Sequence, residues 1–167
     1  MNCCQTIDIH NPPIEIAESI SVRFRCDRCK TLGRAVARKT VLLMLKSDFL
    51  EQAMNGRYRF CTHPDCPVVY FPEGGGPHFT VNDLRVRVGI KVKDDPIPLC
   101  YCFGFDESHI RHEIAQTGCT SVPEKVSNLI RQGLCACDTR NPLGVCCLSE
   151  VIRVSKQLVL ESVDSFR

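Results

Sequence analysis

The chain has 167 residues, of which 44% are hydrophobic and 24% are charged, and this composition is that of an ordinary soluble globular protein. The formal net charge is only +2, so charge gives no reason to expect nucleic-acid binding. The best apolar run, residues 40–45, is far too short to span a membrane. We therefore expect neither a nucleic-acid partner nor insertion into a membrane.

The chain contains 13 cysteines, which is a high number for its length. Residues 1–9 have no basic segment followed by a hydrophobic run and do not predict a secretory signal. Many cysteines without an export signal favour reduced thiols and metal binding over disulfides, and hence a cytoplasmic protein. The odd total and the doublets Cys3-Cys4 and Cys146-Cys147 also fit a disulfide framework poorly.

The amino-terminal half is predicted to be rich in strands. Residues 1–19 show little periodicity and are interpreted as an arm or disordered tail. Residues 20–24 alternate apolar and polar side chains, which predicts a strand. A helix is predicted over residues 46–54, and further strands over residues 58–60 and 68–71.

The middle of the chain carries a helix cap and a linker. Thr80 is placed to cap a short helix. Residues 91–98 contain charged side chains and two prolines, and this composition predicts a connection between two halves. We therefore expect a first lobe at residues 20–95 and a second domain at residues 96–167.

The carboxy-terminal half is predicted to be helical. Asp106 is a good N-cap for a helix over residues 107–116. Residues 121–124 match a capping box that opens a second helix, and Gly133 ends it. A third helix is predicted from Cys147 to about residue 163.

A first set of cysteines lies in the amino-terminal half, as a Cys-x2-Cys pair and a Cys-x4-Cys pair. The members of this set are Cys26, Cys29, Cys61 and Cys66. Two such loops can bring four sulfur atoms to one zinc ion in a closed tetrahedral site, and such a site has no open position for catalysis. His63 is an alternative ligand, but a role outside the metal's own ligands is favoured once four cysteines are present.

A second set of cysteines frames the helical half. Cys100 and Cys102 are separated by one residue, and on extended backbone both sulfur atoms would face the same way and reach one iron. A 2Fe-2S cluster needs a second pair, which must follow the two helices. Spacing alone does not choose among the four candidates Cys135, Cys137, Cys146 and Cys147. A zinc site or buried free thiols are the alternative interpretation.

Three segments of this half resemble the amino-terminal domain of the copper chaperone CopZ family, a relative of bacterioferritin-associated ferredoxin. They are Cys100-Tyr101-Cys102, the Gly-Leu-Cys-Ala-Cys of residues 133–137 and the Asn-Pro-Leu-Gly-Val-Cys-Cys of residues 141–147. Residues 66–71 and 87–91 carry the resemblance into the first half.

The resemblance implies a site for each set of cysteines. A 2Fe-2S cluster would be bound by Cys100, Cys102, Cys137 and Cys147, with Cys135 and Cys146 as the fallback for the last two. Zinc would be bound by Cys26, Cys29, Cys61 and Cys66. The fold class implied is α+β: a small zinc-bound β-rich lobe followed by a helix-turn-helix 2Fe-2S domain resembling bacterioferritin-associated ferredoxin, with a carboxy-terminal helix.

The function implied is that of a redox protein that binds an iron–sulfur cluster and zinc. It would carry one electron at a time and be linked to copper or other metal handling, for example by reducing Cu(II) to Cu(I). The alternative is a metal-delivery module like a copper chaperone, without redox turnover. Either activity makes it an electron-transfer or binding protein rather than a dedicated enzyme.

The partners implied are a redox protein or a copper transporter or chaperone. Cu⁺ is a further candidate ligand, because thiolates bind it well and Cys3-Cys4 offers two of them. We expect no copper-binding ferredoxin-like domain of the CopZ type here, because few residues follow residue 151.

Overall fold

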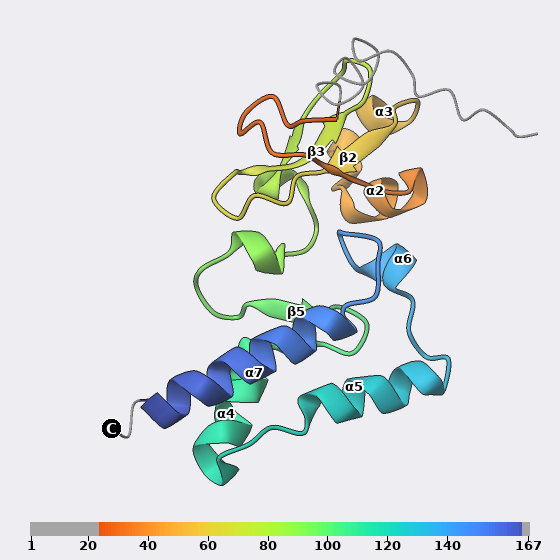
Figure 1. Ribbon diagram of the computed structural model, residues 1–167. Coiled ribbons are helices and arrows are strands. Elements are labelled where there is room, and N and C mark those ends of the chain that lie inside the picture. The colour runs from red at the N-terminus through yellow and green to blue at the C-terminus, as the bar shows by residue number, and fades with distance from the viewer. Residues whose placement is uncertain (1–23, 165–167) are drawn as a thin grey trace, which may run out of the picture.

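The computed structural model describes residues 24–164, so the predicted arm and almost all of the strand predicted at residues 20–24 lie outside the described part. The fold mixes helices and sheet, as the predicted α+β class requires (Figure 1). Within the described residues, no helix combines the length and the apolar character needed to cross a membrane.

The first half contains a sheet, two short α-helices and three 3-10 turns. Its elements are β1 (Arg34–Ala35), α2 (Arg38–Met44), η1 (Ser47–Phe49), α3 (Leu50–Ala53), β2 (Tyr58–Phe60), β3 (Val68–Pro72), β4 (Phe79–Thr80), η2 (Val81–Asp83) and η3 (Gly89–Lys91). The strands form one antiparallel sheet in the order β1-β2-β3-β4. The strands predicted at residues 58–60 and 68–71 are therefore confirmed.

Strand β3 is the centre of this half because both of its faces are covered. Val69 and Tyr70 pack in a core with α2, whereas Val68 and Phe71 pack against the first set of cysteines. This explains why four consecutive residues of β3 are apolar or aromatic and buried. The sheet thus joins the hydrophobic core directly to the candidate metal site.

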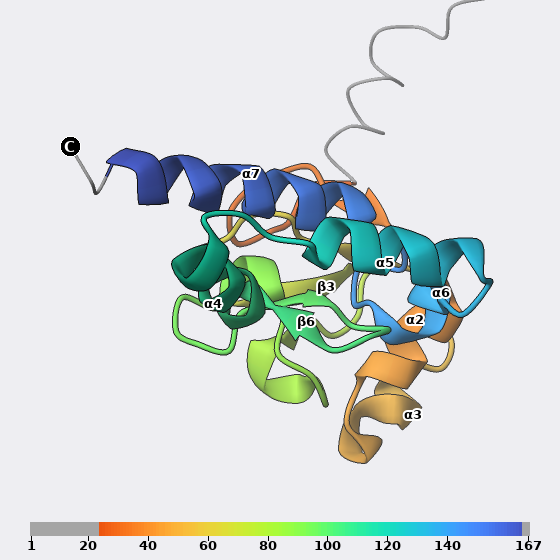
Figure 2. The same cartoon turned by 90° about the horizontal axis from the view of Figure 1, so that it is seen from below.

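The second half is a two-stranded sheet with four helices. Its elements are β5 (Pro98–Cys100), β6 (Phe105–Asp106), α4 (Glu107–Thr117), α5 (Val122–Arg131), α6 (Cys137–Arg140) and α7 (Leu148–Asp164). Figure 2 shows α7 lying along α4 and α5. The apolar sides of these helices form one core with the second set of cysteines, through Ile110, Val122, Val126, Val151 and Leu158.

The two halves touch where the short helix α6 lies against α2 (Figure 1). The fully buried hydroxyl of Thr40 donates a 2.6 Å hydrogen bond to the carbonyl of Asp138. The buried hydroxyl of Tyr70 donates a 2.7 Å hydrogen bond to the carbonyl of Pro142. Both acceptors lie in the segment that carries Cys137 and Cys147, so the first half supports the loops of the second.

Two of the three predicted helix caps agree with the structure. Asp106 caps α4 by accepting from the backbone N–H of His109, and Thr80 forms a capping box with Asp83, both as predicted. The capping box predicted at residues 121–124 is wrong: the Ser121 side chain makes no cap hydrogen bond to its own helix. Its hydroxyl instead donates to the carboxylate of Glu113 on the preceding helix.

Candidate metal centres

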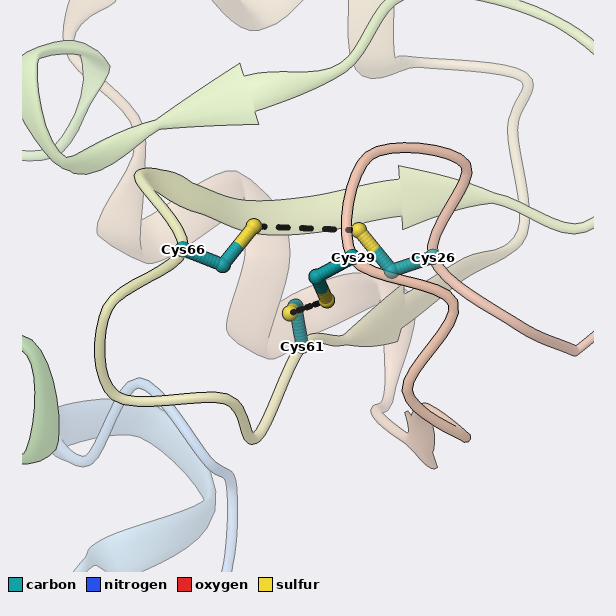
Figure 3. A group of neighbouring side chains, drawn as sticks. All are labelled: Cys26, Cys29, Cys61 and Cys66. Carbon is teal, nitrogen blue, oxygen red and sulfur yellow. Dashed lines mark hydrogen bonds between the residues drawn. The ribbon is translucent and has the colours of Figure 1, made fainter.

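The four cysteines of the first set converge on one point (Figure 3). Their sulfur atoms all lie within 4.8 Å of one another. The Sγ atoms of Cys26 and Cys66 are 3.9 Å apart, and those of Cys29 and Cys61 are 3.5 Å apart. Four sulfur atoms at about 2.3 Å from a tetrahedral zinc ion would lie about 3.8 Å apart. The set therefore has the spacing that a single ion of this size requires.

Two tight loops produce this convergence. In the first loop the Lys30 N–H donates to the Cys26 carbonyl at 2.7 Å, and the Cys26 N–H donates to the Thr31 carbonyl at 2.9 Å. Lys30 adopts a left-handed conformation, with φ of 61°, to close the turn. In the second loop Cys61 follows the last residue of β2, and the Cys66 N–H donates back to the His63 carbonyl at 3.3 Å.

The thiols of this set differ in acidity. Burial raises the pKa of Cys61 and of Cys26. Burial also raises the pKa of Cys29, but hydrogen bonds from the side chain and backbone of Thr31 outweigh it and lower that pKa to about 6. Burial and hydrogen bonding therefore set the acidities of these thiols apart, and thiolates this close would also repel one another. A metal cation would remove the repulsion and allow all four to bind as thiolates.

His63 takes no place among the four sulfur atoms. Its Nδ1 accepts a 3.2 Å hydrogen bond from the backbone N–H of Asp65 within the loop. Sequence reasoning missed Lys91, whose ammonium group donates to the carbonyls of His63 and Cys66 at 2.9 and 3.0 Å. A cation held against this loop offsets part of the negative charge that four thiolates bring together.

The second set also comes together, but as two pairs. The Sγ atoms of Cys102 and Cys137 are 3.5 Å apart, and the thiols of Cys100 and Cys147 share a hydrogen bond. All four side chains belong to the core cluster of the second half. Each pair joins the β5–β6 turn to the segment before α7.

The expectation that Cys100 and Cys102 lie on extended backbone is wrong. Strand β5 ends at Cys100, and residues 101–104 form a turn in which the Gly104 N–H donates to the Cys100 carbonyl at 2.9 Å. Gly104 has a φ of 72°, a conformation that glycine adopts readily. The turn separates the two neighbours and directs each towards a partner after α5.

Backbone N–H groups surround the sulfur atoms of the second set. The Ala136 N–H donates to Cys102 Sγ at 3.3 Å, and the Cys147 N–H donates to Cys137. Cys100 accepts hydrogen bonds from the thiol of Cys147 and from the backbone of Phe103, and these lower its pKa to about 6. Burial raises the pKa of Cys137 to about 12. Hydrogen bonding thus makes one thiol of this set acidic, while burial makes another weakly acidic.

Burial separates the four cysteines that compete for the second pair. Cys137 and Cys147 are buried and make the sulfur contacts just described, whereas Cys135 is half-buried and Cys146 is exposed. Cys119, at the end of α4, is also exposed. Cys3 and Cys4 lie outside the described residues.

The two sets differ in the kind of metal group that they could hold. Among residues 24–164, the four side chains of the first set form a compact group, in which all the ligand atoms lie within 4.8 Å of one another. The second set offers close pairs rather than one such cluster. Four ligands around a single ion must all be close, whereas two irons joined by sulfide can each take one pair.

Comparison with known proteins relates this chain to the CopZ proteins. Residues 23–85 match the CopZ family model whose description is "Zinc binding domain". The chain is 33% identical over 125 residues to the copper chaperone CopZ of Archaeoglobus fulgidus, an alignment that covers 74% of this chain. The chain spans 58% of the length of that relative.

A solved structure agrees with this sequence match. The X-ray structure of the Archaeoglobus fulgidus CopZ N-terminal domain superposes with a TM-score of 0.64 at 31% sequence identity. The match covers 78% of this chain and 96% of that domain. The likeness therefore extends beyond residues 23–85 into the half that carries the second set.

Proposed function

Because the chain belongs to the CopZ family, as a relative of the CopZ amino-terminal domain, we propose that it is a chaperone-like metal-binding module that serves copper handling. The observation that carries the proposal is the grouping of eight cysteines, four of them around one point in the first half and four as two close pairs in the second. Its partner in this role would be a copper transporter or a second copper chaperone.

We assign zinc to the first set, with Cys26, Cys29, Cys61 and Cys66 as ligands. The support is the tetrahedral spacing of the sulfur atoms and the match of this region to a zinc-binding domain. Four thiolates complete the coordination of zinc, so its role would be structural. The residues fix the β2–β3 connection to the turn before β1, and so anchor the sheet.

We assign a 2Fe-2S cluster to the second set, with Cys100, Cys102, Cys137 and Cys147 as ligands. The support is the paired arrangement of the sulfur atoms and their burial in the core of the second half. When bound, such a cluster supplies one-electron oxidation and reduction. The N–H groups of Ala136, Phe103 and Cys147 would stabilise the more negative state and raise the reduction potential.

One-electron transfer is the second candidate function, and the N–H donors to sulfur are the observation that favours it. In that case the second half would pass an electron to a partner protein, or to Cu(II) so that it becomes Cu(I). In the delivery function, by contrast, the thiols outside the two sets would bind Cu(I) and hand it over. Cys3, Cys4 and the exposed Cys146 are the candidates for that role.

Metal content of anaerobically purified protein tests the two assignments. We expect one zinc, two irons and two sulfides per chain. The variant Cys66→Ser should lose zinc and keep iron, and Cys137→Ser should lose iron and keep zinc. Cys119→Ser, which changes an exposed thiol outside both sets, is the matched control. Zinc in both sets would contradict the cluster assignment.

Copper titration separates delivery from electron transfer. For delivery, we expect tight Cu(I) binding that is lost when Cys3 and Cys4 are both replaced by serine, together with a cluster whose visible spectrum does not change during copper transfer. For electron transfer, the reduced cluster should be oxidised by Cu(II) in a one-to-one ratio. Failure of the unaltered protein to bind Cu(I) would contradict the delivery function.

A further inference from the structure

One segment of the chain contacts the loops of both cysteine sets. It runs from Arg87 through η3 to Tyr101, leaving the first half at the buried Val88 and entering the second at β5. In Figure 1 this segment descends from the sheet to β5 along one side of the molecule. Towards one end, Lys91 contacts the loop that carries two cysteines of the first set, and at the other end Tyr101 lies in the turn that carries two cysteines of the second.

At the first end, Lys91 holds the loop between Cys61 and Cys66. Its ammonium group donates to the carbonyls of His63 and Cys66, at 2.9 and 3.0 Å, and lies 5.8 Å from the centre of the Phe60 ring. The side chain is half-buried beneath the loop. These contacts fix the loop on which two ligands of the first set sit.

The neighbouring Lys93 shows what an ordinary surface lysine does on the same segment. Its side chain is 78% exposed and forms an ion pair with Asp65 at the outside of the loop. The ammonium group of Lys93 thus pairs with a side-chain carboxylate, whereas that of Lys91 donates to backbone carbonyls. The orientation of Lys91 is therefore specific to its position in η3.

At the other end, Tyr101 connects η3 to the second set. It lies between Cys100 and Cys102 in the sequence, and its hydroxyl accepts a 2.8 Å hydrogen bond from the Gly89 N–H. The same hydroxyl donates to the Arg87 carbonyl at 3.1 Å. The turn that presents two cysteines of the second set is thus tied by one side chain to the start of η3, the 3-10 turn that ends at Lys91.

Gly89 makes the connection stiff. A Cβ atom at this position would lie 2.0 Å from the Pro98 carbonyl oxygen, so only glycine allows η3 to pack directly on the backbone of β5. Pro98 is the first residue of the strand that ends at Cys100. A shift of η3 would therefore displace the β5 backbone as well as the Tyr101 hydrogen bonds.

We propose that Lys91, Gly89 and Tyr101 couple the two metal sites, so that metal in either set strengthens binding of metal at the other. The inference rests on the proposed function, in which both sets hold metal. Lys91 and Tyr101 are positioning residues, because they touch the loops and not the metals. Coupling of this kind is reciprocal: each metal must raise the affinity of the other by the same factor.

Zinc affinity measured in two states of the protein tests the coupling. Competition with a chromophoric zinc chelator would be run on protein that holds its cluster and on protein purified without iron from iron-starved cells. We expect the cluster to raise zinc affinity about tenfold, within the usual range for coupled sites. Iron should also be lost more slowly to a ferric chelator from protein that holds zinc than from protein without zinc.

Two variants and two matched controls locate the coupling. Tyr101→Phe keeps the ring but loses both hydrogen bonds, and Lys91→Met keeps the apolar stem but loses the ammonium group. Both should bring the ratio of zinc affinities close to one. Tyr58→Phe, which removes a buried hydroxyl that donates to Gln52, and Lys93→Met should leave the ratio unchanged. Lys91→Arg, which keeps the positive charge, should keep part of the difference in zinc affinity between the two states of the protein.

The experiments distinguish failure of the coupling from failure of the proposed function. Absence of iron and sulfide from the purified protein would overturn the cluster assignment and the coupling together. Iron bound normally, with equal zinc affinities in the two states of the wild-type protein, would overturn the coupling alone. A purely structural role would lower the unfolding temperature of both variants and leave the ratio at its wild-type value. If either variant fails to fold, the wild-type ratio still decides.

Discussion

At the residue scale, the carboxylate of Glu113 replaces the predicted cap of α5. It accepts hydrogen bonds from the Thr120 hydroxyl at 2.8 Å, the Ser121 backbone N–H at 2.6 Å and the Lys125 ammonium group at 2.6 Å. A negative group at a helix start also interacts favourably with the helix dipole. The one carboxylate of Glu113 therefore joins α4 to the beginning of α5.

Glu113 should stabilise the fold in a pH-dependent way. The hydrogen bond from Lys125, followed by that from Thr120, lowers the pKa of Glu113 from 4.5 to about 2. A lowered pKa means that its contribution is complete above pH 4.5 and disappears as the pH falls towards 2. We expect Glu113→Gln to reduce the free energy of unfolding by about 1 kcal/mol at pH 7, because the pair is partly screened by solvent.

Urea unfolding followed by circular dichroism would measure this effect at pH 7 and pH 3. The difference between wild type and Glu113→Gln should shrink at pH 3, and loss of metal in acid affects both proteins alike. Asp95→Asn, in the exposed loop at residues 93–96, is the control and should change stability little. An equal difference at the two pH values would contradict the assigned role.

At the element scale, the packing of α6 on α2 depends on one buried hydroxyl. Thr40→Val keeps the shape of the side chain and leaves the Asp138 carbonyl without its 2.6 Å donor. Leaving a buried acceptor unsatisfied costs about 1–3 kcal/mol, and we expect a loss of that size in thermal or urea unfolding. Thr117→Val, at the exposed end of α4, should stay within about 0.5 kcal/mol of wild type.

The contact between η3 and β5 makes a second prediction at this scale. Gly89→Ala would place a methyl group 2.0 Å from the Pro98 carbonyl oxygen, so the backbone must move. We expect a loss of about 2 kcal/mol or more in the free energy of unfolding. Gly74→Ala is the matched control, because a Cβ there meets nothing within 4 Å. Equal stability of the two variants would show that η3 can shift freely.

The sequence predicts the elements whose signals are local. Asp106 marks the start of α4, and the apolar spacing after Cys147 predicts α7. Helix α6 was not predicted, because its four residues have no periodicity and owe their conformation to packing on α2. The turn after Cys100 was missed because the Cys-x-Cys spacing was interpreted as extended, although Gly104 was a signal for a turn.

The convergence of the cysteine sets was only partly predictable. A Cys-x2-Cys loop and a Cys-x4-Cys loop separated by strands indicate one site in the first half, and that grouping is present in the structure. Spacing could not choose among the late cysteines, because the choice depends on burial. Cys137 and Cys147 face the core, whereas Cys146 faces solvent, and this follows from how the residues before α7 pack. The identity of the bound metals stays a prediction.

At the scale of the whole molecule, the proposed zinc should stabilise both halves. A ligand that binds only the folded state at 1,000 times its dissociation constant adds about 4 kcal/mol. For a protein of this size, that corresponds to a fall in unfolding temperature of about 10 °C when zinc is removed. Circular dichroism during heating, with and without chelator, would measure it, since the chain has no tryptophan for fluorescence. An unchanged unfolding temperature would contradict a structural zinc.

The loop at residues 93–96 is exposed along its whole length, while the buried hydroxyls of Thr40 and Tyr70 hold the halves together elsewhere. A single proteolytic cut in this loop should therefore leave a nicked protein that elutes as one species in gel filtration. Separation of the two fragments under native conditions would contradict this prediction. If the two fragments associate again through these contacts, they form a split reporter. A fluorophore on each fragment would then report their reassembly in living cells.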